Sequence, residues 1–156
     1  LSRAFVHDRR VLVEELVIAH EVECAVLGNL APDAPVTGEI VAPGGFYDYN
    51  SKYKNDSARL YIPANIPVAA QDEVRRLAVA IYRALDCRGM ARVDFFVRED
   101  GGVLFNEINT LPGFTSISMY PKMMTAAGMS YGALLTRLLE LAQEERGRRR
   151  AGGRPE

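Results

Sequence analysis

The feature that most constrains the fold of this sequence is a pair of apolar segments joined by a short polar stretch. "MARVDFFV" (residues 90–97) and "VLFNEIN" (residues 103–109) are rich in β-branched and aromatic residues, which favour strands. Between them lie Asp100 and Gly101, and Asp-Gly is typical of a tight two-residue hairpin turn. The sequence therefore predicts an antiparallel hairpin centred on this dipeptide.

The predicted hairpin gathers polar side chains on one of its faces. With Asp100 and Gly101 at the centre of the turn, Asp94 pairs with Glu107 and Arg92 pairs with Asn109. Alternate side chains of a strand share a face, so these four side chains lie together. The opposite face is predicted to be apolar, and its members are Val93, Phe95, Leu104 and Ile108.

Two carboxylates that face each other across a hairpin point to a bound cation. Paired residues have Cβ atoms about 4.5–5.5 Å apart, where like charges repel. Asp94, Glu107 and Asn109 offer hard oxygen ligands, which suit Mg²⁺ or Mn²⁺ better than zinc. Arg92 lies one step along the same face, beside any phosphate that the metal carries. Two alternatives stay open: a one-residue slip of the turn, and an ordinary solvated acidic face with Arg92 in a salt bridge.

The segment after the second strand, "TLPGFTS", supports a ligand site. Pro112 and Gly113 predict a turn beside the predicted metal, and Gly113 lets a backbone N–H group approach a ligand closely. Thr115, Ser116 and Ser118 add hydroxyl groups.

In the remaining chain, the sequence predicts strands first and helices later. Strands are predicted at residues 9–17, 21–28 and 37–45, a long loop at 44–59, and a short extended piece at 60–64; helices are predicted at 68–89, from Pro121 to near Gly128, and at 131–146 with Ser130 as the cap. The first helix is expected to bury Val74, Leu77, Ala78, Ile81 and Leu85. Strands without alternating helices favour an α+β fold with an antiparallel sheet.

Composition narrows the classes of protein to consider. The 156 residues carry a net charge of −1, which gives no reason to expect a nucleic acid or an anionic membrane as a partner. We see no apolar run long enough to span a membrane and no secretion signal. Cys24 and Cys87 are interpreted as buried thiols of a cytoplasmic protein, and His7 and His20 as structural residues.

Several separate stretches, in order, resemble the D-alanine–D-alanine ligases of the ATP-grasp superfamily. These stretches are "VLVEELVIAHEVECAVLG", "GFYDYNSKY" and "ARVDFFV…GGVLFNEINTLPGFTSISMYP", and the resemblance runs from about Phe5 to Ala142. It implies an α+β, ATP-grasp C-terminal domain with a largely antiparallel sheet flanked by helices. Residues 1–16 would end the central domain, residues 17–146 would form the C-terminal domain, and residues 147–156 a disordered basic tail.

The resemblance also implies an activity. In this family, ATP phosphorylates the carboxylate of one D-alanine, and the amine of a second D-alanine attacks the acylphosphate, which yields a peptidoglycan precursor. The implied cofactors are ATP and two Mg²⁺ (or Mn²⁺) ions. The implied enzyme is a cytoplasmic homodimer with no nucleic acid and no membrane partner.

Residue roles carry over from the resemblance position by position. Asp94, Glu107 and Asn109 match the metal ligands. Arg92 matches the residue that contacts the transferred phosphate, and Gly113 matches a second donor to the developing oxyanion. Ser118, with the adjacent backbone N–H, matches the site for the carboxylate of the second D-alanine.

The nucleotide would be held by residues from the start of the chain and from the long loop. Glu14, Glu15 and Val17 match the residues that read adenine, and Glu21 matches the ribose ligand. Lys52 would contact phosphate, and Lys52 with Tyr53 would close over the substrates. Without the resemblance, the three acidic residues would be interpreted as ordinary exposed strand charge.

Other functions remain as alternatives. The Lys-Tyr pair favours the dipeptide product over the D-alanine–D-lactate or D-alanine–D-serine products of vancomycin-resistance relatives. Another ATP-grasp carboxylate–amine ligase, a nucleotide- or metal-binding module without catalysis, and a purely structural domain are the remaining hypotheses. The family has two domains ahead of the resembling region, so the isolated chain is expected to be inactive.

Overall fold

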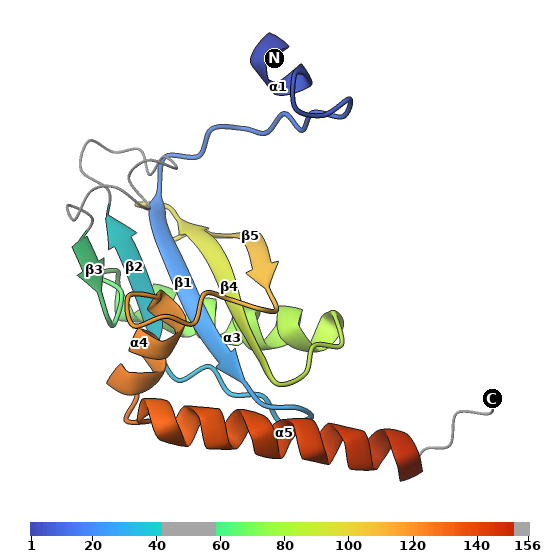
Figure 1. Cartoon of the computed structure of the whole chain (residues 1–156). Helices are drawn as coiled ribbons and strands as arrows, with labels where there is room; N and C mark the ends of the chain where they lie inside the picture. The colour runs from blue at the N-terminus through green and yellow to red at the C-terminus, as the bar shows by residue number, and fades with distance from the viewer. Residues whose placement is uncertain (42–58, 152–156) are drawn as a thin grey trace.

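A computed structural model shows one five-stranded antiparallel sheet with helices on both faces, and it describes residues 1–41 and 59–151 (Figure 1). The strand order is β3-β2-β1-β4-β5. The strands are β1 (His20–Leu27), β2 (Thr37–Val41), β3 (Arg59–Tyr61), β4 (Met90–Val97) and β5 (Val103–Asn109). The helices are α1 (Ser2–Phe5), α3 (Val68–Ala84), α4 (Met119–Ala126) and α5 (Tyr131–Ala151). The predicted α+β class with an antiparallel sheet is therefore confirmed.

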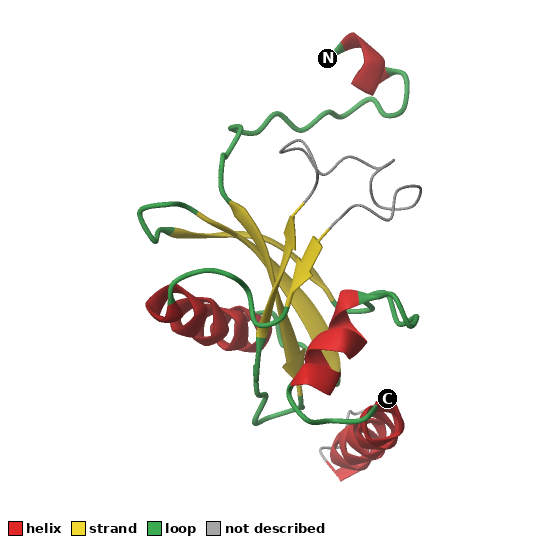
Figure 2. Cartoon of the chain, turned by 90° about the vertical axis from the view of Figure 1, so that its left-hand side faces the viewer, coloured by secondary structure: helices red, strands yellow, loops and turns green. Residues whose placement is uncertain are grey.

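The two faces of the sheet are covered by different helices. Helix α3 packs on one face, while α4 and α5 lie on the other (Figure 2). The core on the α3 side includes Val93 and Phe95 of β4, together with Val74, Ala78 and Tyr82 of α3. The core on the other side joins Ala25 and Leu27 of β1 to residues of α4 and α5, namely Met119, Tyr120, Met123, Met124, Leu134 and Leu141. Side chains along β1 and β4 alternate between the two faces of the sheet, so these strands contribute apolar residues to the core on each face.

The β4–β5 hairpin has the predicted pairs but not the predicted turn. The N–H of Arg98 donates to the carbonyl of Gly102 at 2.8 Å, so three residues rather than two lie between the paired ends. Gly101 takes a positive φ of 84°, a conformation that favours glycine. A register shift next to Asp94 then leaves Asn106 as an extra residue in β5.

The bulge at Asn106 has two consequences. It restores the pairing of Asp94 with Glu107 and of Arg92 with Asn109, as predicted. It also corrects the prediction for Leu104, because Leu104 pairs with Phe96 and lies on the polar face rather than on the α3 side. Val103 packs against the α3-side core in its place. The turn is one residue longer than predicted, and the extra residue in β5 cancels the resulting change in strand register.

The strand predicted at residues 9–17 is absent. The segment has no strand assignment and pairs with none of the described strands, although it is extended (Figure 1). Leu12, Val13 and Leu16 are between 68% and 79% exposed. β-branched composition favours an extended backbone, but a strand also needs a hydrogen-bonded neighbour. The prediction was wrong because the described part of the chain provides no such neighbour.

Two helix ends differ from the predictions. Helix α3 stops at Ala84 rather than near Gly89, and Asp86 has a positive φ of 53° that breaks the helix. Leu85 is therefore outside the helix and 56% exposed, whereas Tyr82 is fully buried. At the other end of the chain, α5 continues past Arg146 to Ala151, so the first part of the predicted basic tail is helical. Residues 152–156 and 42–58 lie outside the described residues, so the prediction of a long loop at 44–59 is not tested there, while Arg59 begins β3.

Both cysteines are buried, as predicted. The side chains of Cys24 and Cys87 are free thiols. Burial raises the pKa of the Cys24 thiol to about 12. A thiol with so high a pKa is a poor nucleophile, so Cys24 acts as a small core residue.

Ser130 caps α5 as predicted, which allows a test of the fold. Its Oγ accepts a hydrogen bond from the N–H of Ala133 at 3.2 Å. We expect Ser130→Ala to lower the free energy of unfolding by about 1 kcal/mol, because an N–H group of the first turn loses its partner. Urea unfolding of the chain measures this change. Ser116→Ala, at an exposed loop position, should change stability by less than half as much.

Candidate active site

Three carboxylates lie in a row across the neighbouring strands β1, β4 and β5 of the sheet. Glu23 in β1 pairs with Asp94 in β4, and Asp94 pairs with Glu107 in β5. Val93 and Phe95 point to the α3 side, so the acidic residues point to the side of α4 and α5. We refer to Glu23, Asp94 and Glu107 as the acidic row.

Arg92 and Asn109 lie beside the acidic row: Arg92 offsets part of its charge, and Asn109 donates hydrogen bonds to it. The Nε of Arg92 donates to Oδ1 of Asp94 at 2.8 Å, and its Nη2 donates to Oδ2 at 2.7 Å. The same Nε lies 3.3 Å from Oε2 of Glu23. The amide of Asn109 donates to Asp94 at 3.2 Å and to Glu107 at 3.0 Å. The predicted cluster of Arg92, Asp94, Glu107 and Asn109 is therefore assembled.

The ionisation of this cluster follows from burial and from neighbouring charges. Burial raises the pKa of the Asp94 carboxyl above its usual value, and the hydrogen bonds and charge of Arg92 oppose that rise. Burial alone would lower the pKa of Arg92, but the Asp94 hydrogen bonds and the Glu23 charge raise it above its ordinary value. Arg92 is thus a permanently charged group held among carboxylates.

The donor set can be tested against a hard divalent cation. Asp94 and Glu107 provide carboxylate oxygens, and Asn109 provides an amide oxygen, so every ligand atom is an oxygen. Among residues 1–41 and 59–151, no group of three or more His, Cys, Asp or Glu is arranged to hold a metal by itself. These residues fit a cation such as Mg²⁺, which commonly completes its coordination with phosphate oxygens and water.

Two adjoining cavities lie on the face of the acidic row. One, of about 200 Å³, is lined by Glu23, Arg92, Asp94 and Glu107 among others. The other, of about 500 Å³, is lined by the predicted nucleotide residues Glu14, Glu15, Val17 and Glu21, and by Phe96, Leu104, Phe105 and Asn106. Glu21, Phe96 and Asn106 line both cavities. The structure therefore brings the four described nucleotide candidates to one cavity beside the acidic row.

The loop between β5 and α4 places two further candidates together. This loop crosses the sheet on the side of α4 (Figure 1). A Cβ added to Gly113 would lie 2.9 Å from Oγ of Ser118, so only glycine fits there without a shift. The Ser118 hydroxyl accepts a hydrogen bond from the N–H of Thr115 at 3.1 Å. Ser118 also precedes the first turn of α4, where backbone N–H groups lack partners within the helix.

Some candidates are not placed, and others were missed. Lys52 and Tyr53 lie outside the described residues. Sequence reasoning did not single out Glu23 or Phe96, which line the site. The available signal for Glu23 was its spacing from Glu21, because two acidic residues two positions apart in an apolar strand share one face.

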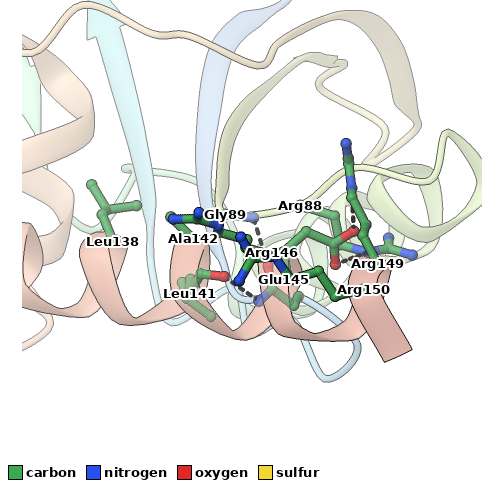
Figure 3. Close-up of a pocket in the computed structure, with 10 residues that line it drawn as sticks. Arg88, Gly89, Leu138, Leu141, Ala142, Glu145, Arg146, Arg149 and Arg150 are labelled. Atoms are coloured by element: carbon green, nitrogen blue, oxygen red, sulfur yellow. Dashed lines mark hydrogen bonds and ion pairs between the residues drawn. The ribbon is translucent and has the colours of Figure 1, made fainter. Parts of the chain in front are cut away.

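A further cavity, of about 560 Å³, lies away from the acidic row between α5 and the start of β4 (Figure 3). Arg88, Arg146, Arg149 and Arg150 line it, over Leu138, Leu141 and Ala142. Glu145 pairs with Arg148 and Arg149 at 2.9 and 3.0 Å and lies 3.6 Å from Arg88. This cavity contains none of the predicted site residues.

An antiparallel sheet that presents paired carboxylates, an arginine and an adjoining cavity agrees with the C-terminal part of an ATP-grasp enzyme, as the resemblance implies. Solved structures support this class. A D-alanine–D-alanine ligase from Coxiella burnetii matches with a TM-score of 0.77 and 38% identity, over 96% of this chain and 40% of that one. The enzyme from Bacillus anthracis complexed with ATP matches with a TM-score of 0.76 and 31% identity, over 94% of this chain and 47% of that one.

Sequence comparisons assign the family. The family model described as "D-ala D-ala ligase C-terminus" matches residues 1–140. A D-alanine–D-alanine ligase A from Chromobacterium violaceum is 56% identical over 93% of this chain, and the B enzyme from Clostridium tetani is 55% identical over 91%. The chain belongs to the D-alanine–D-alanine ligase family. It spans about 40% of the length of the curated relatives that it matches.

Proposed function

We propose that this chain is the C-terminal part of a ligase that joins two D-alanine molecules at the expense of ATP. The observation that carries the proposal is the assembled cluster of Arg92, Asp94, Glu107 and Asn109 beside the cavity lined by Glu14, Glu15, Val17 and Glu21. In the described part of the chain, no helix combines the length and the hydrophobicity that a membrane span requires. From the family resemblance, we further propose that the intact enzyme is a cytoplasmic homodimer.

Of the two cavities beside the acidic row, the one of about 500 Å³ suits a nucleotide. Phe96, Leu104 and Phe105 offer apolar surface for a base, and the backbone of Glu15 and Val17 offers polar groups to its edge. Glu21 lies where the two cavities meet and would accept hydrogen bonds from ribose hydroxyls. The nucleotide phosphates would then extend from this cavity toward the acidic row.

The acidic row would act on those phosphates. Asp94, Glu107 and Asn109 would hold Mg²⁺, which neutralises phosphate charge during phosphoryl transfer. Arg92 would donate hydrogen bonds to the transferred phosphoryl group, since a charged guanidinium binds phosphate oxygens well. Lys52 is proposed to contact the same phosphate.

The loop after β5 would hold the amino-acid end of the reaction. The N–H of Gly113 would donate to the oxyanion that develops on the attacked carbonyl carbon. Ser118 and the adjacent N–H groups of α4 would bind the carboxylate of the second D-alanine. Tyr53, together with Lys52, is proposed to close the site and keep water from the acylphosphate.

Phosphate release tests this function in a full-length ligase that carries this chain as its C-terminal part, for example on the N-terminal part of the Chromobacterium violaceum relative. We expect phosphate release that requires Mg²⁺, ATP and D-alanine together. L-alanine should support less than about a hundredth of the rate, because a site that positions the reacting groups rejects the misplaced enantiomer. Equal turnover with L-alanine would contradict the proposal.

The same assay tests whether the second substrate is D-alanine, D-serine or D-lactate, and therefore which product the enzyme makes. A D-Ala:D-Ser ligase from Enterococcus faecalis matches this chain with a TM-score of 0.69 and 41% identity, over 81% of this chain and 37% of that one. D-serine and D-lactate are therefore tested as second substrates beside D-alanine. We expect D-alanine to give the highest kcat/KM; preference for either of the others would reassign the product.

A further inference from the structure

Glu23 is a buried carboxylate for which the proposed function gives no role. It is 8% exposed and lies in β1, opposite Asp94. A buried carboxylate is costly unless an opposite charge compensates it. Arg92 supplies an opposite charge, because its Nε lies 3.3 Å from Oε2 of Glu23. Glu23 thus lies on the opposite side of Asp94 from Glu107 and in contact with Arg92.

The two carboxylates that hold Arg92 are not equivalent. Asp94 accepts two hydrogen bonds from Arg92, one on each oxygen, at 2.8 and 2.7 Å. The contact of Glu23 with the same guanidinium is longer, at 3.3 Å. Asp94 is also a proposed cation ligand, so Arg92 and a cation compete for the oxygens of Asp94. A second carboxylate next to Arg92 changes the outcome of that competition.

We propose that Glu23 is a positioning residue that retains Arg92 when Asp94 turns its oxygens to a divalent cation. This inference rests on the proposed function. With Glu23 present, the charge of Arg92 stays compensated after Asp94 releases it, and its Nη groups become available to phosphate. With Glu23 neutralised, Asp94 remains the principal anionic partner of Arg92, and the guanidinium opposes cation binding.

The test measures cation affinity directly, in the full-length ligase that carries this chain. Mn²⁺ replaces Mg²⁺, ATP is replaced by a non-hydrolysable analogue, and free Mn²⁺ is followed by electron paramagnetic resonance. We expect Glu23→Gln to raise the Kd for Mn²⁺ about 10-fold or more, the size seen when residues that support metal ligands are lost. We also expect kcat to fall while the KM for D-alanine stays within about twofold.

The role of Arg92 in this effect is tested by a double-mutant cycle. In the Arg92→Met background, Glu23→Gln should change the Kd for Mn²⁺ by less than about twofold, because no guanidinium remains to be held. A loss of the same size in both backgrounds would overturn the inference, since Glu23 would then act on the cation directly. An unchanged Kd in the Glu23→Gln single variant, beside a wild type that binds Mn²⁺, would also overturn it.

Glu39 provides a matched control. It is another buried strand carboxylate, 2% exposed, and it contacts His20 at 2.6 Å and the N–H of Asn65 at 2.9 Å. It pairs with Val22, so it lies on the α3 side of the sheet, away from the acidic row. Glu39→Gln should leave the Kd for Mn²⁺ unchanged. An equal effect of Glu39→Gln would show that loss of any buried carboxylate is enough, and would overturn the inference.

Two further measurements distinguish a failure of this inference from misfolding of the variant and from a failure of the proposed function. If Glu23→Gln does not fold, Glu23→Asp replaces it, and the shorter carboxylate should raise the Kd for Mn²⁺ by an intermediate factor. An unchanged Kd in that variant, with the fold intact, contradicts the inference. Absence of D-alanine-dependent phosphate release from a wild type that binds Mn²⁺ would instead reject the proposed function.

Discussion

Asp94→Asn in a full-length ligase that carries this chain is expected to lower kcat by more than about 100-fold. The substitution keeps the size of the side chain but removes the charge that faces both the proposed cation and Arg92. Loss of residues that only support metal ligands already costs about 10- to 100-fold, so loss of a ligand charge should cost more. Steady-state phosphate release with D-alanine and Mg²⁺-ATP measures the effect.

The fold should survive Asp94→Asn, which separates a chemical effect from unfolding. Arg92 keeps Glu23 as an ionic partner at 3.3 Å, so no buried charge is left alone. Far-ultraviolet circular dichroism should therefore be unchanged. Asp72→Asn, on the exposed side of α3, is the matched control and should retain full activity. Activity within about threefold of wild type in Asp94→Asn would contradict the proposed role of Asp94 as a metal ligand.

The polar face of the hairpin could be predicted because it depends on alternation over short distances. Arg92, Asp94, Glu107 and Asn109 are two apart in each strand, so any pairing that matches Asp94 with Glu107 puts all four together. The actual turn differs from the predicted one, and the extra residue at Asn106 compensates for it. The pairing of carboxylates was therefore right although the local geometry that was assumed to produce it was wrong.

What the sequence could not predict depends on contacts between distant segments. Glu23 becomes part of the site only because β1 lies between β2 and β4, and strand order is not visible in a local pattern. The segment at residues 9–17 has the composition of a strand, but pairing requires a neighbour that composition does not supply. Leu104 changed faces because of one bulge. In each case, tertiary pairing decided the outcome.

Phe95 and Phe96 offer the second test with a large expected effect, because adjacent strand residues point to opposite layers. Phe95 is 1% exposed in the α3-side core and packs edge to face against Phe105, with ring centroids 6.2 Å apart. Phe95→Ala should lower the free energy of unfolding by about 3–5 kcal/mol, since it removes a ring from a closely packed core. Urea unfolding of the chain measures this loss.

Phe96 is the matched variant, since it differs from Phe95 in the layer that it faces. It is only partly buried and lines both cavities on the acidic face. Phe96→Ala should cost less than half as much stability as Phe95→Ala, because less apolar area leaves water on folding. It should instead raise the KM for ATP in the full-length ligase, as its ring lines the proposed base cavity. Equal stability losses at the two positions, with an unchanged KM for ATP, would contradict both the layer assignment and the nucleotide cavity.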